Sequence, residues 1–238
     1  MMFIKLDGSM ITDAPFSIDW KNLNRLVAEI GALKEELVVA HGADNFGRHV
    51  ANEYGGTPEG YVKAREVTLK LSMYVVSAFS SRNLPAVVFS PSSFLFAHGG
   101  KIKEALIGPI REAVGRFIPI IHGDLVVDSK DGYTFFSAEE VMVALSEKMK
   151  PRKILMATDV PEDLVENKIE TVKDSNFKTT YAQLGGIARD KIMECGRLSA
   201  RCGCPVVIFD GRKKGEMAKA QVSESGIVIR IKDEDVLK

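Results

Sequence analysis

A loop with the residue types of a phosphate site follows an apolar run early in the chain. The segment VVAHGADNFGRHVANEYG begins at Val38 as a strand-like run and then carries glycines, two histidines, an aspartate and an arginine. A strand, a glycine turn and a helix in this order aim backbone N–H groups at an anion. Asp44 places a negative charge in the same loop, so these residues alone leave open whether it binds phosphate.

A second candidate lies at the start of the chain, where Lys5 interrupts the apolar run MFIKL before Asp7-Gly8-Ser9. A lysine ammonium that reaches past the end of a strand can neutralise a phosphoryl group, and small residues in the turn can offer backbone N–H groups. The alternative is a surface lysine on an edge strand, followed by an ordinary strand-to-helix turn.

Strands and helices that alternate along the chain must position these turns. Apolar spacing predicts helices over residues 18–33 with Asp19 as N-cap, 61–81, 138–149 with Ser137 as N-cap, and 187–201. Short apolar runs predict strands over residues 2–6, 37–40, 84–89, 117–122, 153–157, 205–209 and 226–231, with a hairpin over 125–136. This alternation predicts an α/β fold with a largely parallel central sheet.

Small polar turns end five of the predicted strands or precede a helix: DGS, HGADNFG, HGD, ATD and LGG. In open α/β sheets, ligands bind outside the carboxyl ends of the strands. We therefore expect these turns to converge on one crevice.

The composition limits the partners and the compartment. Lys and Arg total 32, as do Asp and Glu, so no net charge favours nucleic acid or an anionic membrane as a partner. No apolar run approaches the roughly 18–20 residues of a membrane span. Three cysteines without a signal peptide predict a cytoplasmic protein. Cys202 and Cys204 could form a metal or redox pair, although their spacing favours buried thiols.

Several segments together resemble a known family. KLDGSMITD resembles the KxGGSxIT start of the amino acid kinase superfamily, and AHGADNFGRHVANEY resembles the HGxGSFGHxxAxEY loop of its archaeal isopentenyl phosphate kinases. Further matches follow in the family's order: LPAVVFSPSSFLFAHGGKI, IPIIHGDLVVDS, KILMATDV, LGGI and GIVI. On this resemblance the chain is identified as a divergent isopentenyl phosphate kinase.

The resemblance implies a three-layer α/β/α sandwich that transfers a phosphoryl group from ATP, with Mg²⁺, to isopentenyl phosphate. It implies a phosphate-acceptor lobe over residues 1–150 and a nucleotide-binding lobe over 151–238, within a single compact domain. It also implies a homodimer whose ligands are an isoprenoid phosphate and ATP.

The family's site residues carry over by position. Lys5 matches the lysine at the transferred phosphoryl group, and Arg48, or His49 beside it, matches the histidine at the acceptor phosphate. The matches to the acceptor site are Gly8, Ser9, Gly42, Ala43, Gly47, Ser92, Phe94, His98, Gly123 and Asp124. The matches to the nucleotide site are Thr158, Asp159, Gly185, Gly186 and Lys191. No residue of this chain is assigned as a metal ligand.

The chain departs from the family pattern at several site positions. Acidic or polar residues replace small ones at Asp7, Asp44 and Asn45, and the family SGD turn reads Ser137-Ala138-Glu139. Ala14 replaces a lysine and Arg48 a histidine, Pro161 enters the nucleotide loop, and Asp190 stands where a basic residue is expected. Arginine can hold phosphate through two hydrogen bonds, but extra carboxylates beside phosphates are costly. Two alternatives remain open: a catalytically silent binding or regulatory relative, and a kinase with another small acceptor.

Overall fold

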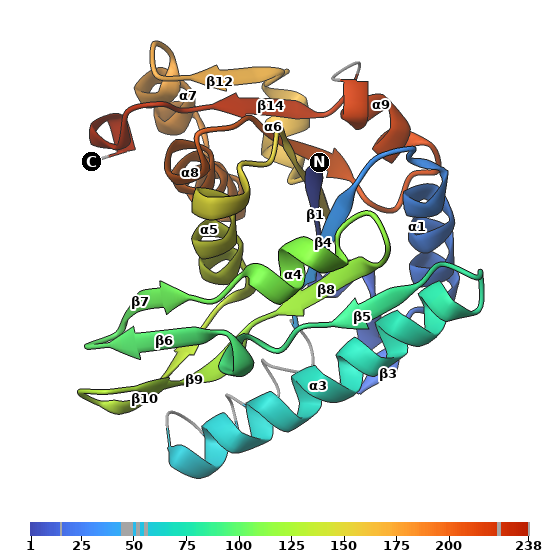
Figure 1. The fold of residues 1–238 in the computed structure, drawn as a ribbon. Coiled ribbons are helices and arrows are strands. Elements are labelled where there is room, and N and C mark those ends of the chain that lie inside the picture. The colour runs from blue at the N-terminus through green and yellow to red at the C-terminus, as the bar shows by residue number, and fades with distance from the viewer. Residues whose placement is uncertain (15, 44–49, 51–52, 55–56, 223–224, 238) are drawn as a thin grey trace.

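An eight-stranded sheet forms the centre of the molecule, in the order β12-β14-β13-β11-β1-β4-β8-β5 (Figure 1). The computed structural model describes residues 1–238 except 15, 44–49, 51–52, 55–56, 223–224 and 238. The strands are β1 (Met2–Leu6), β4 (Leu37–His41), β5 (Ala86–Val88), β8 (Ile118–His122), β11 (Ile154–Thr158), β12 (Thr171–Lys173), β13 (Val206–Asp210) and β14 (Ile227–Arg230). Every neighbouring pair is parallel except β13 with β14, which confirms the largely parallel sheet.

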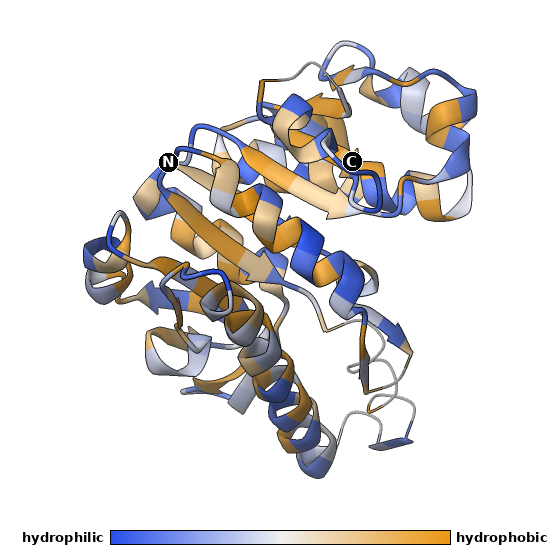
Figure 2. Ribbon diagram, turned by 90° about the vertical axis from the view of Figure 1, so that its right-hand side faces the viewer, coloured by the Kyte–Doolittle hydropathy of each residue, from blue (hydrophilic) through white to orange (hydrophobic). Residues whose placement is uncertain are grey.

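Helices cover both faces of this sheet and complete the predicted three layers (Figure 1). One face packs against α1 (Trp20–Ala32), α3 (Pro58–Ser80) and α9 (Glu216–Val222). The other packs against α4 (Gly108–Ala113), α5 (Ala138–Met149), α6 (Glu162–Glu166), α7 (Phe177–Gln183) and α8 (Gly186–Cys202). In Figure 2 the central strands are mostly orange, because a sheet covered on both faces needs apolar residues on both.

Capping side chains fix where two helices begin. The carboxylate of Asp19 accepts a hydrogen bond from the backbone N–H of Asn22 at the start of α1. Ser137 and Glu140 form a reciprocal capping box at the start of α5. Both N-caps match the sequence prediction. The α5 cap matters for the site, because it sets the position of Glu139 in the first turn.

A smaller sheet, in the order β10-β9-β6-β7, stands beside the larger one (Figure 1). Its strands are β6 (Leu95–His98), β7 (Lys101–Ala105), β9 (Asp124–Asp128) and β10 (Gly132–Phe136). The β9–β10 hairpin confirms the predicted one. The carboxylate of Asp128 accepts hydrogen bonds from four backbone N–H groups, those of Gly99, Gly100, Lys130 and Asp131, and so ties both hairpin turns together.

Several short elements were not predicted, because they have too few residues to show a period. They are the hairpin of β2 (Thr12–Ala14) and β3 (Ser17–Ile18), the 3-10 helices η1 (Gly8–Met10), η2 (Pro91–Ser93) and η3 (Glu234–Leu237), and α6, α7, α9, β6 and β12. The segment between Asp159 and Gly185 folds into α6, β12 and α7. The helix predicted over 61–81 begins at Pro58, with Thr57 as its N-cap.

Candidate active site

A cleft of about 610 Å³ lies at the carboxyl edge of the central sheet, where the turns after β1, β4, β8 and β11 meet. Polar turns at the ends of parallel strands thus converge as the sequence predicts. Nine of the predicted site residues line this cleft: Lys5, Gly8, Ser9, Gly42, Ala43, Gly123, Thr158, Asp159 and Lys191. The predicted Gly47, Arg48 and His49 lie outside the described residues.

Lys5 projects into the cleft from the middle of the sheet. Its strand, β1, pairs with β11 on one side and β4 on the other, and the residue is only 4% exposed. The alternative of a surface lysine on an edge strand is therefore wrong. Its Nζ lies 2.9 Å from Oδ1 of Asp7 and 3.4 Å from Oε1 of Glu194, and it also contacts Glu139. The ammonium group of Lys5 is thus held by carboxylates at the wall of the cleft.

Lys191 brings a second ammonium group to the same place from α8. Its Nζ lies 2.9 Å from Oδ2 of Asp7 and 3.2 Å from Oε2 of Glu194. Burial alone would lower the pKa of Lys191, but Asp7 and Glu194 raise it above its usual value, so the side chain stays charged. Asp190, which stands at the position where the family pattern has a basic residue, lines a neighbouring cavity instead.

Asp7 lies between the two lysines. Burial would raise the pKa of its carboxyl, but Lys5 and Lys191 lower it to about 2. The extra negative charge that the sequence places here is therefore neutralised by two ion pairs in the folded protein.

Glycines allow the backbone of adjacent turns to approach closely in the cleft. A Cβ on Gly42 would lie 3.2 Å from the backbone nitrogen of Gly8, a tight contact that would push the β1 and β4 turns slightly apart. A Cβ on Gly123 would lie 2.9 Å from the carbonyl oxygen of Phe136. Two of the glycines predicted at the acceptor site, Gly8 and Gly42, are thus neighbours in space.

Arg212 joins two of these turns from the loop after β13. Its Nε lies 2.8 Å from Oδ1 of Asp159, and its Nη2 donates to the carbonyl oxygen of Ser9 at 2.8 Å. Sequence reasoning missed this residue. The available signal was its position just past the end of a parallel strand, in the run VVIFDGR, which ends at the same edge of the sheet.

Four residues predicted at the acceptor site do not line the cleft. Asp124 is fully buried and accepts hydrogen bonds from Arg65 Nε at 2.9 Å, Ser92 N at 3.0 Å and Leu125 N at 2.9 Å. Asp124 therefore holds the Ser92 loop in place beside the cleft. Phe94 is buried in the core. His98 is exposed, with its Nδ1 2.9 Å from Ser129 Oγ in the smaller sheet, away from the cleft.

Gly185 and Gly186 lie at the start of α8. They do not line the cleft themselves, but the next residue, Ile187, does. Gly185 caps the helix and its N–H donates to Oδ2 of Asp163 at 3.2 Å, while Ile187 and Lys191 line the cleft. Their position at the helix start is the one from which backbone N–H groups favour an anion.

Two buried histidines lie immediately before the cleft glycines, at the ends of β4 and β8. His41 Nε2 lies 2.8 Å from Ser72 Oγ, and burial together with His122 lowers the pKa of His41 to about 3. Burial also lowers the pKa of His122. Both rings are therefore neutral at neutral pH.

Comparison with known proteins identifies the family of this chain. The sequence profile of the amino acid kinase family matches residues 1–210. The chain belongs to the amino acid kinase family. It is 29% identical to the isopentenyl phosphate kinase of Methanocaldococcus jannaschii, over 94% of this chain and 96% of that protein. It is 33% identical to the isopentenyl phosphate kinase of Methanothermobacter thermautotrophicus, over 67% of each chain.

Solved structures agree with this assignment. This kinase superposes on a crystal structure of an isopentenyl phosphate kinase with a TM-score of 0.75 and 28% identity, covering 96% of this chain and 99% of that one. The resemblance drawn from the sequence motifs is confirmed, and the departures at single site positions did not mask the family.

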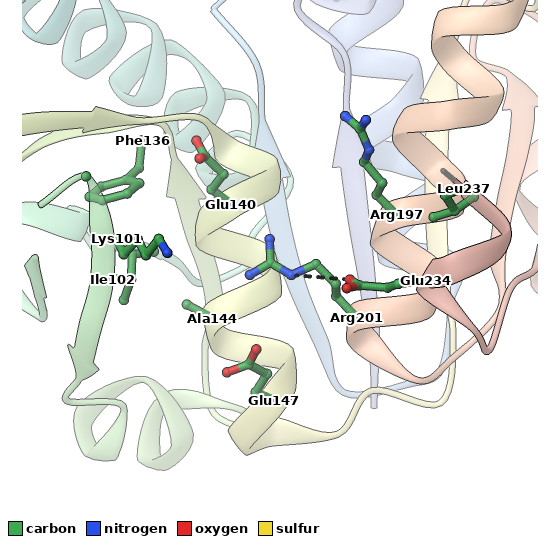
Figure 3. A pocket seen from close by; sticks show the side chains of 11 residues that line it. Lys101, Ile102, Phe136, Glu140, Ala144, Glu147, Arg197, Arg201, Glu234 and Leu237 are labelled. Atoms are coloured by element: carbon green, nitrogen blue, oxygen red, sulfur yellow. Dashed lines mark ion pairs between the residues drawn. The ribbon is translucent and has the colours of Figure 1, made fainter.

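A larger cavity of about 740 Å³ lies between α5 and α8, away from the predicted site (Figure 3). Arg201 extends between the two helices and lies 3.9 Å from Glu234, while Glu140 and Glu147 line the α5 side. Its charges are mixed, and none of the predicted site residues lines it. The predicted site residues that the structure brings together thus lie in the cleft of Lys5 and Lys191 and not in this cavity.

Within the described part of the chain, no cluster of three His, Cys, Asp or Glu side chains is arranged as metal ligands. The same residues include no helix that is long and apolar enough to span a membrane. Cys195, Cys202 and Cys204 are all buried and unpaired, and burial raises the pKa of each thiol. The metal or redox pair considered for Cys202 and Cys204 thus gains no support from the geometry.

Proposed function

We propose that this protein is an isopentenyl phosphate kinase, which transfers the γ-phosphoryl group of ATP to isopentenyl phosphate to form isopentenyl diphosphate. The observation that carries the proposal is the pair of ammonium groups, Lys5 and Lys191, at the carboxyl edge of the sheet. The identity of the acceptor is inferred from relatives that are named isopentenyl phosphate kinase and are similar over nearly the whole chain.

The chemistry required of the protein is mainly electrostatic. The attacking phosphate and the transferred phosphoryl group are both anionic, so they must be neutralised and aligned. In the proposal, Lys5 and Lys191 meet the transferred group, and the backbone of Gly8 and Gly42 supports it. No covalent intermediate with the protein is needed.

The three carboxylates beside the lysines hold them in place until substrate binds. The side chains of Glu139 and Glu194 are 26% and 33% exposed, whereas Asp7 is 14% exposed. The two glutamates can therefore turn toward solvent and leave the ammonium groups to the phosphates. This is how the site accommodates phosphate despite its acidic residues.

We propose that the acceptor lies over residues 1–150 and the nucleotide over 151–238, with Thr158, Asp159 and the start of α8 on the nucleotide side. Mg²⁺ usually binds through substrate phosphates with one or two carboxylates rather than in an all-protein cage. The described residues offer no such cage. Mg²⁺ would arrive on the nucleotide, where it shields phosphate charge.

The homodimer and the cytoplasmic location remain part of the proposal. Trp20 on α1, Met73 and Tyr74 on α3, and Val87 on edge strand β5 expose apolar surface that a second copy could cover. The three free thiols support a reducing compartment. Light scattering of the purified protein gives the oligomeric state.

Two measurements test the function. Calorimetry measures the binding of ATP, and a kinase assay measures turnover with a panel of acceptors. We expect ATP to bind and isopentenyl phosphate to turn over faster than other small phosphates or alcohols. A folded protein that binds isoprenoid phosphate but not ATP would instead be a silent relative. Faster turnover of another acceptor would make it a kinase of different specificity.

A further inference from the structure

Asp7 links the two lysines more tightly than any other described carboxylate. One of its oxygens lies 2.9 Å from Lys5 Nζ and the other 2.9 Å from Lys191 Nζ. Glu194 also contacts both, but at 3.4 Å and 3.2 Å. Thr158 gives Asp7 a further hydrogen bond.

The position of Asp7 is fixed by its backbone as well as by its side chain. It directly follows β1, and its N–H donates to the carbonyl oxygen of Ala157 at 3.0 Å. A short side chain on an anchored backbone has few rotamers to lose. Asp7 therefore connects β1, β11 and α8 at the base of the cleft.

Two ammonium groups so close together repel each other, and a carboxylate between them offsets that repulsion. Groups held in place before substrate arrives lower the cost of aligning the reaction. Glu139 on α5 and Glu194 on α8 also face this cluster, but both are longer and more exposed. Of the three carboxylates, Asp7 is the one best placed to fix the lysines during the reaction.

Resting on the kinase function above, we propose that Asp7 is a positioning residue. It holds the ammonium groups of Lys5 and Lys191 side by side, so that both meet the transferred phosphoryl group. In the KxGGSxIT motif that this segment resembles, a glycine stands where this chain has Asp7. The opposite role is inhibitory, a brake on the reaction, in which the carboxylate of Asp7 competes with the phosphate groups for the two lysines.

Steady-state kinetics on four variants separate the two roles. We expect Asp7→Asn and Asp7→Gly to lower kcat by about 100-fold while KM for ATP changes by less than about threefold. Asp7→Glu keeps the charge, so it should recover at least about tenfold over Asp7→Asn. The matched control is Asp13→Asn, an exposed aspartate of the same segment, which should leave kcat unchanged.

A readout without turnover completes the test. In the unliganded protein with ¹⁵N-labelled lysine, we expect two ammonium signals protected by ion pairs, which Asp7→Asn removes and Asp13→Asn keeps. Thermal unfolding checks that each variant is folded. A kcat of Asp7→Gly above the wild-type value would overturn the proposal in favour of a brake, and unchanged lysine signals in Asp7→Asn would overturn it as well. If wild-type protein gives no product, the proposed function fails, while the lysine signals still decide the role of Asp7 in holding them.

Discussion

Arg212 and Asp159 form an ion pair across the mouth of the cleft, with Nε 2.8 Å from Oδ1. The same guanidinium donates to the carbonyl oxygen of Ser9. It thereby ties the turn after β1 to the turn after β11, the two turns proposed to meet the phosphoryl group and the nucleotide. This relationship could not be derived from either segment alone.

Replacing Arg212 with alanine should weaken nucleotide binding more than stability. The guanidinium is about half exposed, and exposed ion pairs contribute only about 0–1 kcal/mol to folding. Asp159 would then face the nucleotide phosphates without its partner, so KM for ATP should rise about tenfold, equivalent to about 1.4 kcal/mol. Lys213→Ala, which removes a more exposed cation in the same loop, is the control. An unchanged KM for ATP in Arg212→Ala would rule out this role.

Asp124 should matter for stability because it is a buried carboxylate that accepts three hydrogen bonds. Asp124→Asn keeps the size but loses charge-assisted bonds, so the free energy of unfolding should fall by about 2–3 kcal/mol. Urea unfolding measures this change. Lys70→Ala, which breaks only the exposed pair with Glu66, should cause no measurable change. Equal stability of both variants would show that Asp124 does not hold the Ser92 loop.

The buried His41 should make folding stability fall in mild acid. Its pKa is about 3 in the folded protein and near 6.5 when unfolded, so between these values the unfolded state binds the extra proton. Stability therefore decreases as the pH falls from 6.5. From pH 6 to pH 5, wild type should lose about 1 kcal/mol more than His41→Gln. Parallel pH profiles of urea unfolding would contradict the assignment of a neutral His41.

Lys191 should be the cation of α8 that stabilises the transferred phosphoryl group. Lys191→Met removes a charge that faces the cleft, so kcat should fall by about 100-fold. Arg197→Met removes an exposed charge from the same helix and should change kcat little. If both variants lose activity equally, the effect belongs to the helix and not to the ammonium group of Lys191.

Local patterns were sufficient to predict the sheet, the caps at Asp19 and Ser137, and the convergence of the strand-end turns. They also identified Lys5 as a candidate site residue, because a charged residue inside an apolar strand is unusual and must be stabilised by partners at the strand end. Lys191 was expected at the site from the sequence resemblance, and it lines the cleft, whereas Asp190 beside it lines a neighbouring cavity.

Roles that depend on contacts far apart in the sequence were missed. Asp124 was expected to bind substrate, but it is bound by Arg65 and Ser92, 59 and 32 residues away. Asp7 was expected to weaken the site, yet Lys191, 184 residues away, neutralises it. No spacing rule reports such partners.

The most direct test of the account is product formation by the wild-type protein. Purified enzyme is mixed with ATP, Mg²⁺ and isopentenyl phosphate, and ³¹P NMR follows the diphosphate product. We predict isopentenyl diphosphate and ADP in equal amounts, and a rate lower by about 100- to 1,000-fold for Lys5→Met. A folded wild-type protein that binds ATP but forms no isopentenyl diphosphate would contradict the account.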